Sequence, residues 1–207
     1  MSLMIEDFGG RLASVWSELR PTTRGLVERA LQSPGVTAAP TRSNPNAPYD
    51  ARADHELSRL LTALDERAFD ANALLDEKRV ELRRIADTCA AVLQEKSRSA
   101  DVFAQLVRRA DKRRDYKRID SLADALTQFA PSEICELARS QDVVVRALSS
   151  EALAQFPTQV LIGLLSDPVD SEIARDALRR QAVDYGSEEA RQIVNALNQI
   201  HMNQDDL

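Results

Sequence analysis

The sequence predicts an all-α protein built largely from stacked helical hairpins, and two observations support this. Residues 125–129 (ALTQF) recur 27 positions later as residues 152–156 (ALAQF), and a proline follows each copy, at Pro131 and Pro157. Hydrophobic residues make up 43% of the 207 positions but aromatic residues only 4%, a composition that suits closely packed helices better than strands. A recurring hairpin leaves one apolar face uncovered, so stacking on its neighbours is what buries it.

The overall charge and the apolar runs limit the classes of function. The chain has 27 Lys and Arg against 33 Asp and Glu, a net charge of -6, and an acidic chain is a poor non-specific binder of nucleic acid. No apolar run reaches the 18 residues of a membrane span and no secretory leader is visible, so we expect a cytoplasmic protein. Cys89 and Cys135 both lie in helical apolar patterns, which predicts buried thiols rather than a disulfide or a nucleophile.

Residues 4–32 are predicted to form an N-terminal helical segment, and residues 1–3 are set aside as a vector-derived leader. One apolar stripe runs at helical spacing through Ile5, Phe8, Leu12, Val15, Trp16 and Leu19. We expect this stripe to pack as a satellite of the main core, with a second copy or a partner as the alternatives. Residues 33–53 are predicted to be a flexible linker, because four of the eight prolines and almost no large apolar residues fall between 33 and 50.

Residues 54–98 are predicted to form one long amphipathic helix or a helix pair, because glycine and proline are absent from 49 to 130. Ten of eleven positions spaced alternately four and three are apolar: Leu57, Leu61, Leu64, Ala68, Ala71, Leu75, Leu82, Ile85, Cys89 and Val92, with Lys78 as the exception. That spacing is typical of a coiled coil. Three alternatives stay open: a homodimer through residues 57–92, an antiparallel pair that turns near residues 70–72, and the first hairpin of the repeat array.

The repeat domain is predicted over residues 99–203, followed by a frayed tail at 204–207. Apolar clusters place the first hairpin at 102–107 and 119–129, the second at 131–138 and 144–156, and the third at 157–165 and 173–183. Pro131 and Pro157 are predicted to begin new helices. Proline lacks a backbone N–H, and in the first turn of a helix that N–H would have no intrahelical acceptor in any case. Ser187 is a predicted N-cap for a last helix with a polar outer face, as a terminal cap requires.

Two short segments resemble HEAT repeats. Residues 164–168 (LLSDP) match the Asp-Pro turn of that family, and residues 142–146 (DVVVR), followed by Ala152-Leu153, match the Val-Arg pair that opens the second helix of each unit. The third hairpin has Asp-Pro without Val-Arg, and the first has neither in its turn. The resemblance covers roughly residues 100–203 and implies an α-α superhelix that serves as a scaffold or adaptor.

Catalytic patterns are absent from the sequence. The two histidines, His55 and His201, lie in separate segments, and no His, Cys or Asp spacing indicates a metal site. Six scattered glycines form neither a phosphate loop nor a dinucleotide fingerprint, and no nucleophile elbow occurs. We therefore expect no enzymatic activity, no cofactor and no metal.

The strongest anomaly is a basic stretch at residues 108–118, with seven basic and two acidic residues, a net charge of +5. Its candidate partner-binding residues are Arg108, Arg109, Lys112, Arg113, Arg114, Tyr116, Lys117 and Arg118. The structural interpretation is a solvated turn, in which the cations lie near a helix C-terminus because the helix dipole favours positive charge there. The functional one is a non-catalytic protein-interaction or scaffold module that binds an acidic protein partner; the alternative is a nucleic-acid-binding protein that uses the same patch, with Tyr116 for stacking.

Overall fold

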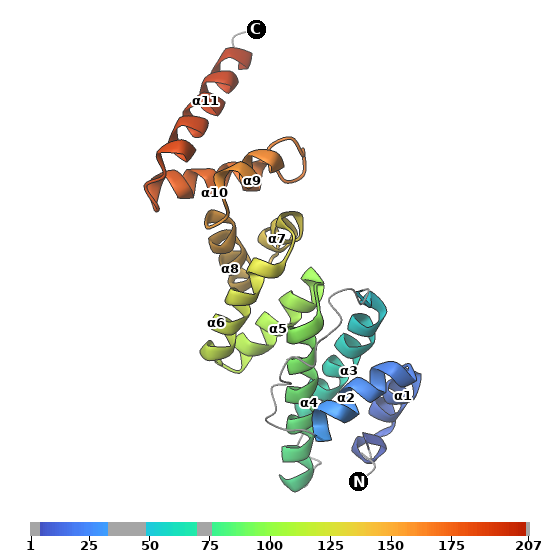
Figure 1. Cartoon of the computed structure of the whole chain (residues 1–207). Helices are drawn as coiled ribbons and strands as arrows, with labels where there is room; N and C mark the ends of the chain where they lie inside the picture. The colour runs from blue at the N-terminus through green and yellow to red at the C-terminus, as the bar shows by residue number, and fades with distance from the viewer. Residues whose placement is uncertain (1–4, 33–48, 70–75, 206–207) are drawn as a thin grey trace. The chain divides into compact units, whose positions relative to one another are not determined.

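The computed structural model describes residues 5–32, 49–69 and 76–205, and all regular structure in these ranges is helical, which confirms the all-α prediction (Figure 1). The predicted linker falls mostly on residues 33–48, which lie outside the described residues. The contacts divide the chain into two compact units, residues 1–103 and residues 104–207. They are called the N-terminal unit and the C-terminal unit below.

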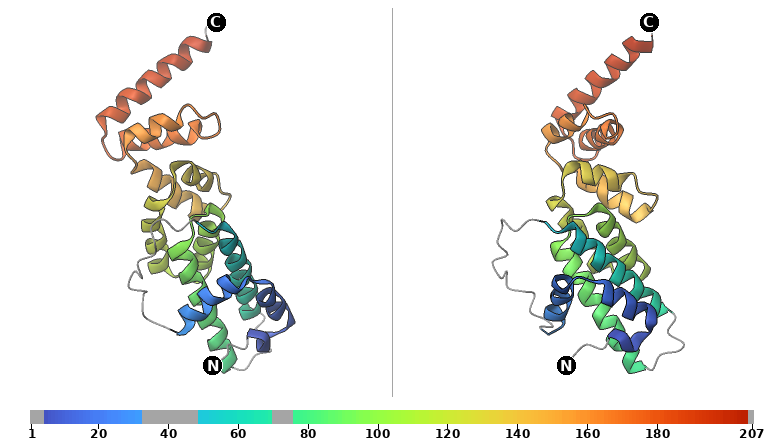
Figure 2. Two further views of the ribbon diagram at one scale, coloured as in Figure 1. Left: turned by 45° about the vertical axis from the view of Figure 1, so that its right-hand side comes forward. Right: turned by 90° about the vertical axis from the view of Figure 1, so that its right-hand side faces the viewer.

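The N-terminal unit is built on two long helices, α3 (Ala51–Phe69) and α4 (Asp76–Lys96), that pack against one another. Preceding them are a short 3-10 helix η1 (Ile5–Phe8), α1 (Gly10–Glu18) and α2 (Pro21–Gln32). Helix α1 packs on α3, while α2 packs on both long helices (Figure 2). Helix α3 begins at Ala51, three residues inside the predicted linker.

The apolar seam of residues 57–92 lies inside this unit. The seam residues Leu57, Leu61, Leu64, Leu82, Ile85, Cys89 and Val92 are all at most 7% exposed within a single chain. Of the arrangements left open by the sequence, the structure contains the helix pair; the proposed turn at 70–72 lies outside the described residues. A second copy could reach these side chains only by opening the pair.

The N-terminal segment packs in cis. Ile5, Phe8, Leu12, Trp16 and Leu19 are all buried, so the predicted stripe is part of the same core as the helix pair. Val15 is only half-buried. The structure therefore contains the expected arrangement, in which residues 5–19 pack against the main core of the same chain.

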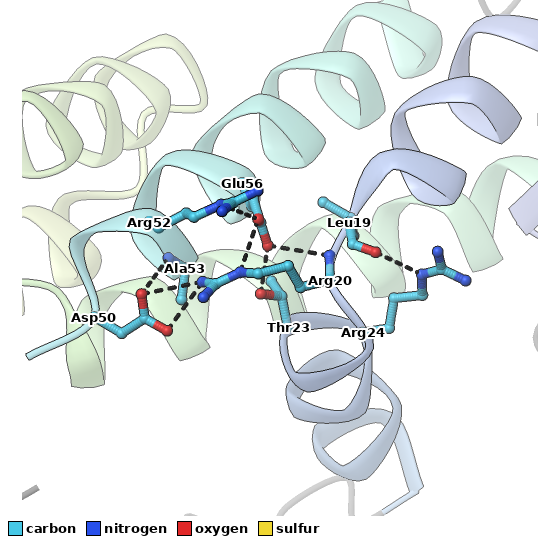
Figure 3. A network of polar contacts seen from close by, with 8 residues as sticks. All are labelled: Leu19, Arg20, Thr23, Arg24, Asp50, Arg52, Ala53 and Glu56. Carbon is cyan, nitrogen blue, oxygen red and sulfur yellow. Dashed lines mark hydrogen bonds and ion pairs between the residues drawn. The ribbon is translucent and has the colours of Figure 1, made fainter.

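A buried carboxylate fastens α2 to α3 (Figure 3). Glu56 of α3 accepts hydrogen bonds from the Thr23 hydroxyl at 2.5 Å, the Arg20 Nε at 2.9 Å and the Arg20 backbone N–H at 3.3 Å. Arg20 directly precedes Pro21, so the carboxylate stands at the N-terminal end of α2, where the helix dipole favours negative charge. Arg20 also donates to both oxygens of Asp50, just before α3.

The environment of Glu56 favours its ionised form. Burial alone would raise the pKa of this carboxyl, but the hydrogen bonds from Thr23 and from the backbone and side chain of Arg20 outweigh burial. The pKa of Glu56 therefore lies below its ordinary value. The carboxylate is charged at neutral pH and holds two segments that the linker separates in sequence.

The C-terminal unit continues the chain as a series of shorter helices. They are α5 (Ala100–Lys112), whose first turn belongs to the other unit, α6 (Tyr116–Ala125), the 3-10 helix η3 (Leu126–Gln128), α7 (Pro131–Ala138), α8 (Val143–Ala154), α9 (Thr158–Leu164), α10 (Ser171–Val183) and α11 (Glu188–Asp205). These bounds follow the predicted hairpins closely. Residues 204 and 205, predicted to fray, belong to α11.

Contacts in the C-terminal unit pass from one helical pair to the next. Helices α7 and α8 pack together, as do α9 and α10. Helix α8 also contacts α6 and η3 on one side and α10 on the other, and α10 contacts α11. The core of this series includes Leu126, Ile134, Val145, Leu153, Leu161 and Leu178, all fully buried.

Helix starts in the C-terminal unit agree with the predicted signals. Pro131 is the first residue of α7, and Pro157 directly precedes α9. The Ser187 hydroxyl accepts a hydrogen bond from the Ala190 N–H at 3.2 Å, as an N-cap does. Val183 ends both the third predicted hairpin and α10, but it is 79% exposed and therefore lies outside the core.

Both cysteines are free and buried, Cys89 in the N-terminal unit and Cys135 in α7. Burial, reinforced by the negative charge of Asp170, raises the pKa of the Cys135 thiol to about 11. A thiol in this state is a poor nucleophile, because the reactive species is the thiolate.

Candidate functional site

The basic stretch forms the turn between α5 and α6. Helix α5 ends in a Schellman motif: the Asp115 N–H donates to the Ala110 carbonyl at 3.0 Å, and the Arg114 N–H donates to the Asp111 carbonyl at 2.9 Å. Asp115 then caps α6 by accepting from the Arg118 N–H at 3.2 Å. The turn is therefore fixed by its own backbone, and its cations project from a defined scaffold.

Arg114 occupies a backbone conformation that normally selects glycine. Its φ is 54°, in the left-handed region that a Schellman motif needs at this position. A residue with a Cβ pays about 1 kcal/mol or more there. Strain of this kind is typical of functional sites, so the arginine side chain is a candidate for a role that glycine could not fill.

Replacing Arg114 with glycine is expected to stabilise the protein by about 1 kcal/mol, because glycine adopts the left-handed conformation without strain. Replacing it with alanine removes the same charge but keeps the Cβ, so it should bring no gain. Urea denaturation followed by circular dichroism measures both. Equal stability of the two variants would show that the backbone at this turn is not strained.

Most side chains of the predicted patch reach solvent. Arg108, Lys112, Arg113, Arg114, Tyr116 and Lys117 are exposed, while Arg109 and Arg118 are half-buried. Tyr116, the first residue of α6, is 66% exposed. The structure thus keeps all eight predicted residues on one helix–turn–helix junction, and it offers an apolar ring beside the cations.

Ion pairs join successive helical pairs of the C-terminal unit, which the sequence did not reveal. The Arg108 Nε lies 3.9 Å from the Asp142 carboxylate, which also caps α8 by accepting from the Val144 and Val145 N–H groups. Arg139, at the end of α7, lies 2.5 Å from Asp170, which directly precedes α10. In both cases a cation on the first helix of one pair meets an aspartate at the start of the second helix of the next pair.

The Asp170 carboxylate bonds to Arg139 of the neighbouring helical pair and does not cap its own helix, α10. The residue is 4% exposed, and its side chain makes no capping hydrogen bond to α10. Arg139 Nη1 also lies 3.4 Å from the Val169 carbonyl as a hydrogen-bond donor. This arginine thereby positions the turn between α9 and α10 against the end of α7.

A cavity of about 460 Å³ opens between α10 and α11, lined by Arg179, Ala182, Val183, Arg191, Val194 and Asn195. Both arginines are paired with acids of their own helix: Arg179 with Asp176 at 2.7 Å, and Arg191 with Glu188 at 2.6 Å. The walls are mainly apolar and aliphatic. This arrangement suits contact with another molecule better than proton transfer.

Within the described residues, no cluster of three or more His, Cys, Asp or Glu side chains could hold a metal ion. No helix there combines the length and the apolar character that crossing a membrane requires. His55 is exposed on α3, and the side chain of His201 lies outside the described residues.

Comparison with known proteins adds no relative: no protein-family model matches the sequence, and neither the curated proteins nor the solved structures gave a significant match.

Proposed function

We propose that the C-terminal unit is a HEAT-like α-α superhelix that acts as a non-catalytic protein-interaction module and binds an acidic protein segment. The sequential contacts from α6 and η3 through α11 support the superhelix, because each pair contacts the next along the chain. The Arg139–Asp170 pair supports it further, as it ties successive turns together. We do not propose self-association through residues 57–92, since the apolar side chains of that seam are already buried within the N-terminal unit.

The observation that carries the proposal is the fixed, exposed basic turn at residues 108–118. The cations stand on a helix end whose backbone is held by a Schellman motif, so the backbone of the turn loses little freedom on binding. The remaining chain carries a net charge of -11, because the whole is -6 and the turn is +5. A nucleic acid would be repelled by much of that remainder, whereas a short acidic segment can meet the turn alone.

Charge reversal at the turn tests the proposal. The variant K112E/R114E/K117E should bind a fluorescent polyglutamate peptide about 100-fold more weakly than the wild type, because attraction becomes repulsion at three exposed positions. The matched control, K78E/R83E/K96E on α4, alters three exposed cations with the same change in net charge and should bind as the wild type does. Fluorescence anisotropy at low ionic strength measures the affinity of the wild type and of both variants for the peptide.

Two outcomes would contradict this function. Equal weakening by the control variant would show that only total charge matters. Tight binding to single-stranded or duplex oligonucleotides, with log K falling against log salt at a slope of about -4, would favour a nucleic-acid-binding protein instead. Tyr116 would then be the stacking residue, and Tyr116→Ala should weaken binding.

A further inference from the structure

The last helix of the C-terminal unit, α11, has an apolar stripe that the described residues leave partly uncovered. Helix α11 packs against α10, and Figure 1 shows that it extends beyond α10 after its first turns. Ala190 is buried there, whereas Ile193, Val194 and Leu197, at helical spacing on one side of α11, are only half-buried. The terminal helix of a stacked series normally turns a polar face outward, so an uncovered apolar stripe indicates a contact with another molecule.

The cavity between α10 and α11 extends the apolar stripe. Val194 lines the cavity from α11, and Val183, which is 79% exposed, lines it from the end of α10. The two arginines of the cavity, Arg179 and Arg191, are each paired with an acid of their own helix. The apolar surface therefore continues from Val183 across the cavity to Leu197, and its cations are already neutralised.

Charge is absent from α11 beyond its first turn. No Asp, Glu, Lys or Arg occurs from Gln192 to Gln204, although 29% of the whole chain is charged and a stretch of this length would hold about four such residues at that average. The central part of a protein–protein interface is depleted of charge in the same way. The composition of α11 therefore agrees with a helix that another protein covers.

The missing charge favours a second copy of this chain as that protein. Two copies with a net charge of -6 each repel one another, and they approach at the lowest cost where neither presents a charge. Ala196 and Asn198, both exposed, lie on the two sides of the stripe, where paired helices usually carry the charges that select a different partner. Here these positions hold a methyl group and an amide. An amide both donates and accepts hydrogen bonds, so the same face can pair with itself.

We propose that the apolar stripe of α11, formed by Ile193, Val194 and Leu197, is a homodimer interface that a second copy of this chain covers with its own α11. The two helices pack across a two-fold axis, so each copy contributes the same face. An 18-residue helix is about 27 Å long, which makes the contact small for a specific interface. The dimer is therefore reversible, with a dissociation constant on the order of tens of micromolar. The interface does not use the basic turn at residues 108–118, so it is independent of the proposed function.

Analytical ultracentrifugation of the full chain tests whether the dimer forms. The average mass should rise from that of one chain towards that of two between about 5 and about 500 µM, a range that brackets the expected dissociation constant. The mass of a single chain at every concentration would overturn the proposal and would leave the stripe to a different protein.

Two variants that add the same charge to different faces of α11 locate the contact. A196E/N198E places carboxylates on both sides of the stripe, whereas Q192E/Q199E places them at exposed positions roughly opposite it. The first variant should dimerise about 30-fold more weakly than the wild type, because like charges then face one another across the interface, and the second should change the affinity by less than about threefold. Circular dichroism confirms that both are folded. Equal weakening by the two variants would overturn the assignment to this face.

Mixing variants of opposite charge tests whether the two copies meet through the same face. A196K/N198K should be as weak a dimer as A196E/N198E when each is alone, because like charges repel in both. A 1:1 mixture of the two should dimerise at least as tightly as the wild type, since attraction replaces repulsion. A mixture that stays monomeric would show that the second copy does not contact this face with its own α11, and the two-fold pairing would be wrong.

Discussion

Replacing Glu56 with alanine is expected to lower the free energy of unfolding of the N-terminal unit by about 2–3 kcal/mol, because it leaves buried polar groups without their partner. Thr23 is fully buried and donates its hydroxyl to this carboxylate. Arg20, 29% exposed, recovers part of its hydration, which keeps the cost below that of a fully buried pair. Urea denaturation followed by fluorescence of Trp16, the sole tryptophan and buried in this unit, measures the change.

Glu66 on the same helix provides a matched control. It pairs with Arg11 of α1 at 2.8 Å, but both side chains are largely exposed. Such surface pairs contribute about 0–1 kcal/mol, so Glu66→Ala should leave the midpoint nearly unchanged. A loss of similar size in both variants would show that Glu56 is not a special link between α2 and α3.

Acid should remove the contribution of Glu56. Its pKa is lower in the folded state than in the unfolded chain, so the unfolded chain binds the proton more tightly. The stability that this group contributes is present above the ordinary glutamate pKa of about 4.3 and is lost as pH falls through the lower folded value. The variant Glu56→Gln should therefore show a weaker decline of Trp16-detected stability below about pH 4.3 than the wild type.

Replacing Arg139 with alanine is expected to destabilise the C-terminal unit by about 2–4 kcal/mol, and replacing Asp170 with alanine by about half of that. The asymmetry follows from burial. Arg139→Ala leaves the buried Asp170 carboxylate unpaired, whereas Asp170→Ala leaves an arginine that is already 39% exposed and can be hydrated. Thermal or urea unfolding followed by circular dichroism measures both. An equal cost, or a larger one for Asp170→Ala, would contradict the burial assigned to this pair.

The helices of the C-terminal unit could be predicted because their signals are local. Pro131 and Pro157 mark helix starts, Ser187 marks another, and the apolar clusters between them follow a helical period. The structure places α7 through α10 within a few residues of the predicted hairpins. The exposed turn at 108–118 could also be predicted, because a run of cations is a property of sequence alone.

The contacts between distant residues could not be predicted in the same way. Glu56 and Thr23 are 33 positions apart, with the linker between them, and neither residue type is distinctive in its helix. Arg139 and Asp170 are 31 positions apart, and nothing in Asp170 itself distinguishes a helix cap from an ion-pair partner. Val183 ends the apolar cluster predicted at residues 173–183 but is exposed, because a helical period alone does not show where a helix extends beyond the helices that cover it.

A double-mutant cycle on Arg139 and Asp170 tests most directly whether successive helical pairs contact one another along the chain. The two single variants and the double variant are compared by urea denaturation. We predict a coupling energy of about 1–3 kcal/mol, because the two residues belong to neighbouring pairs and meet at 2.5 Å. Additive effects with no coupling would mean that the end of α7 and the start of α10 do not meet, and the proposed superhelix would have to be abandoned.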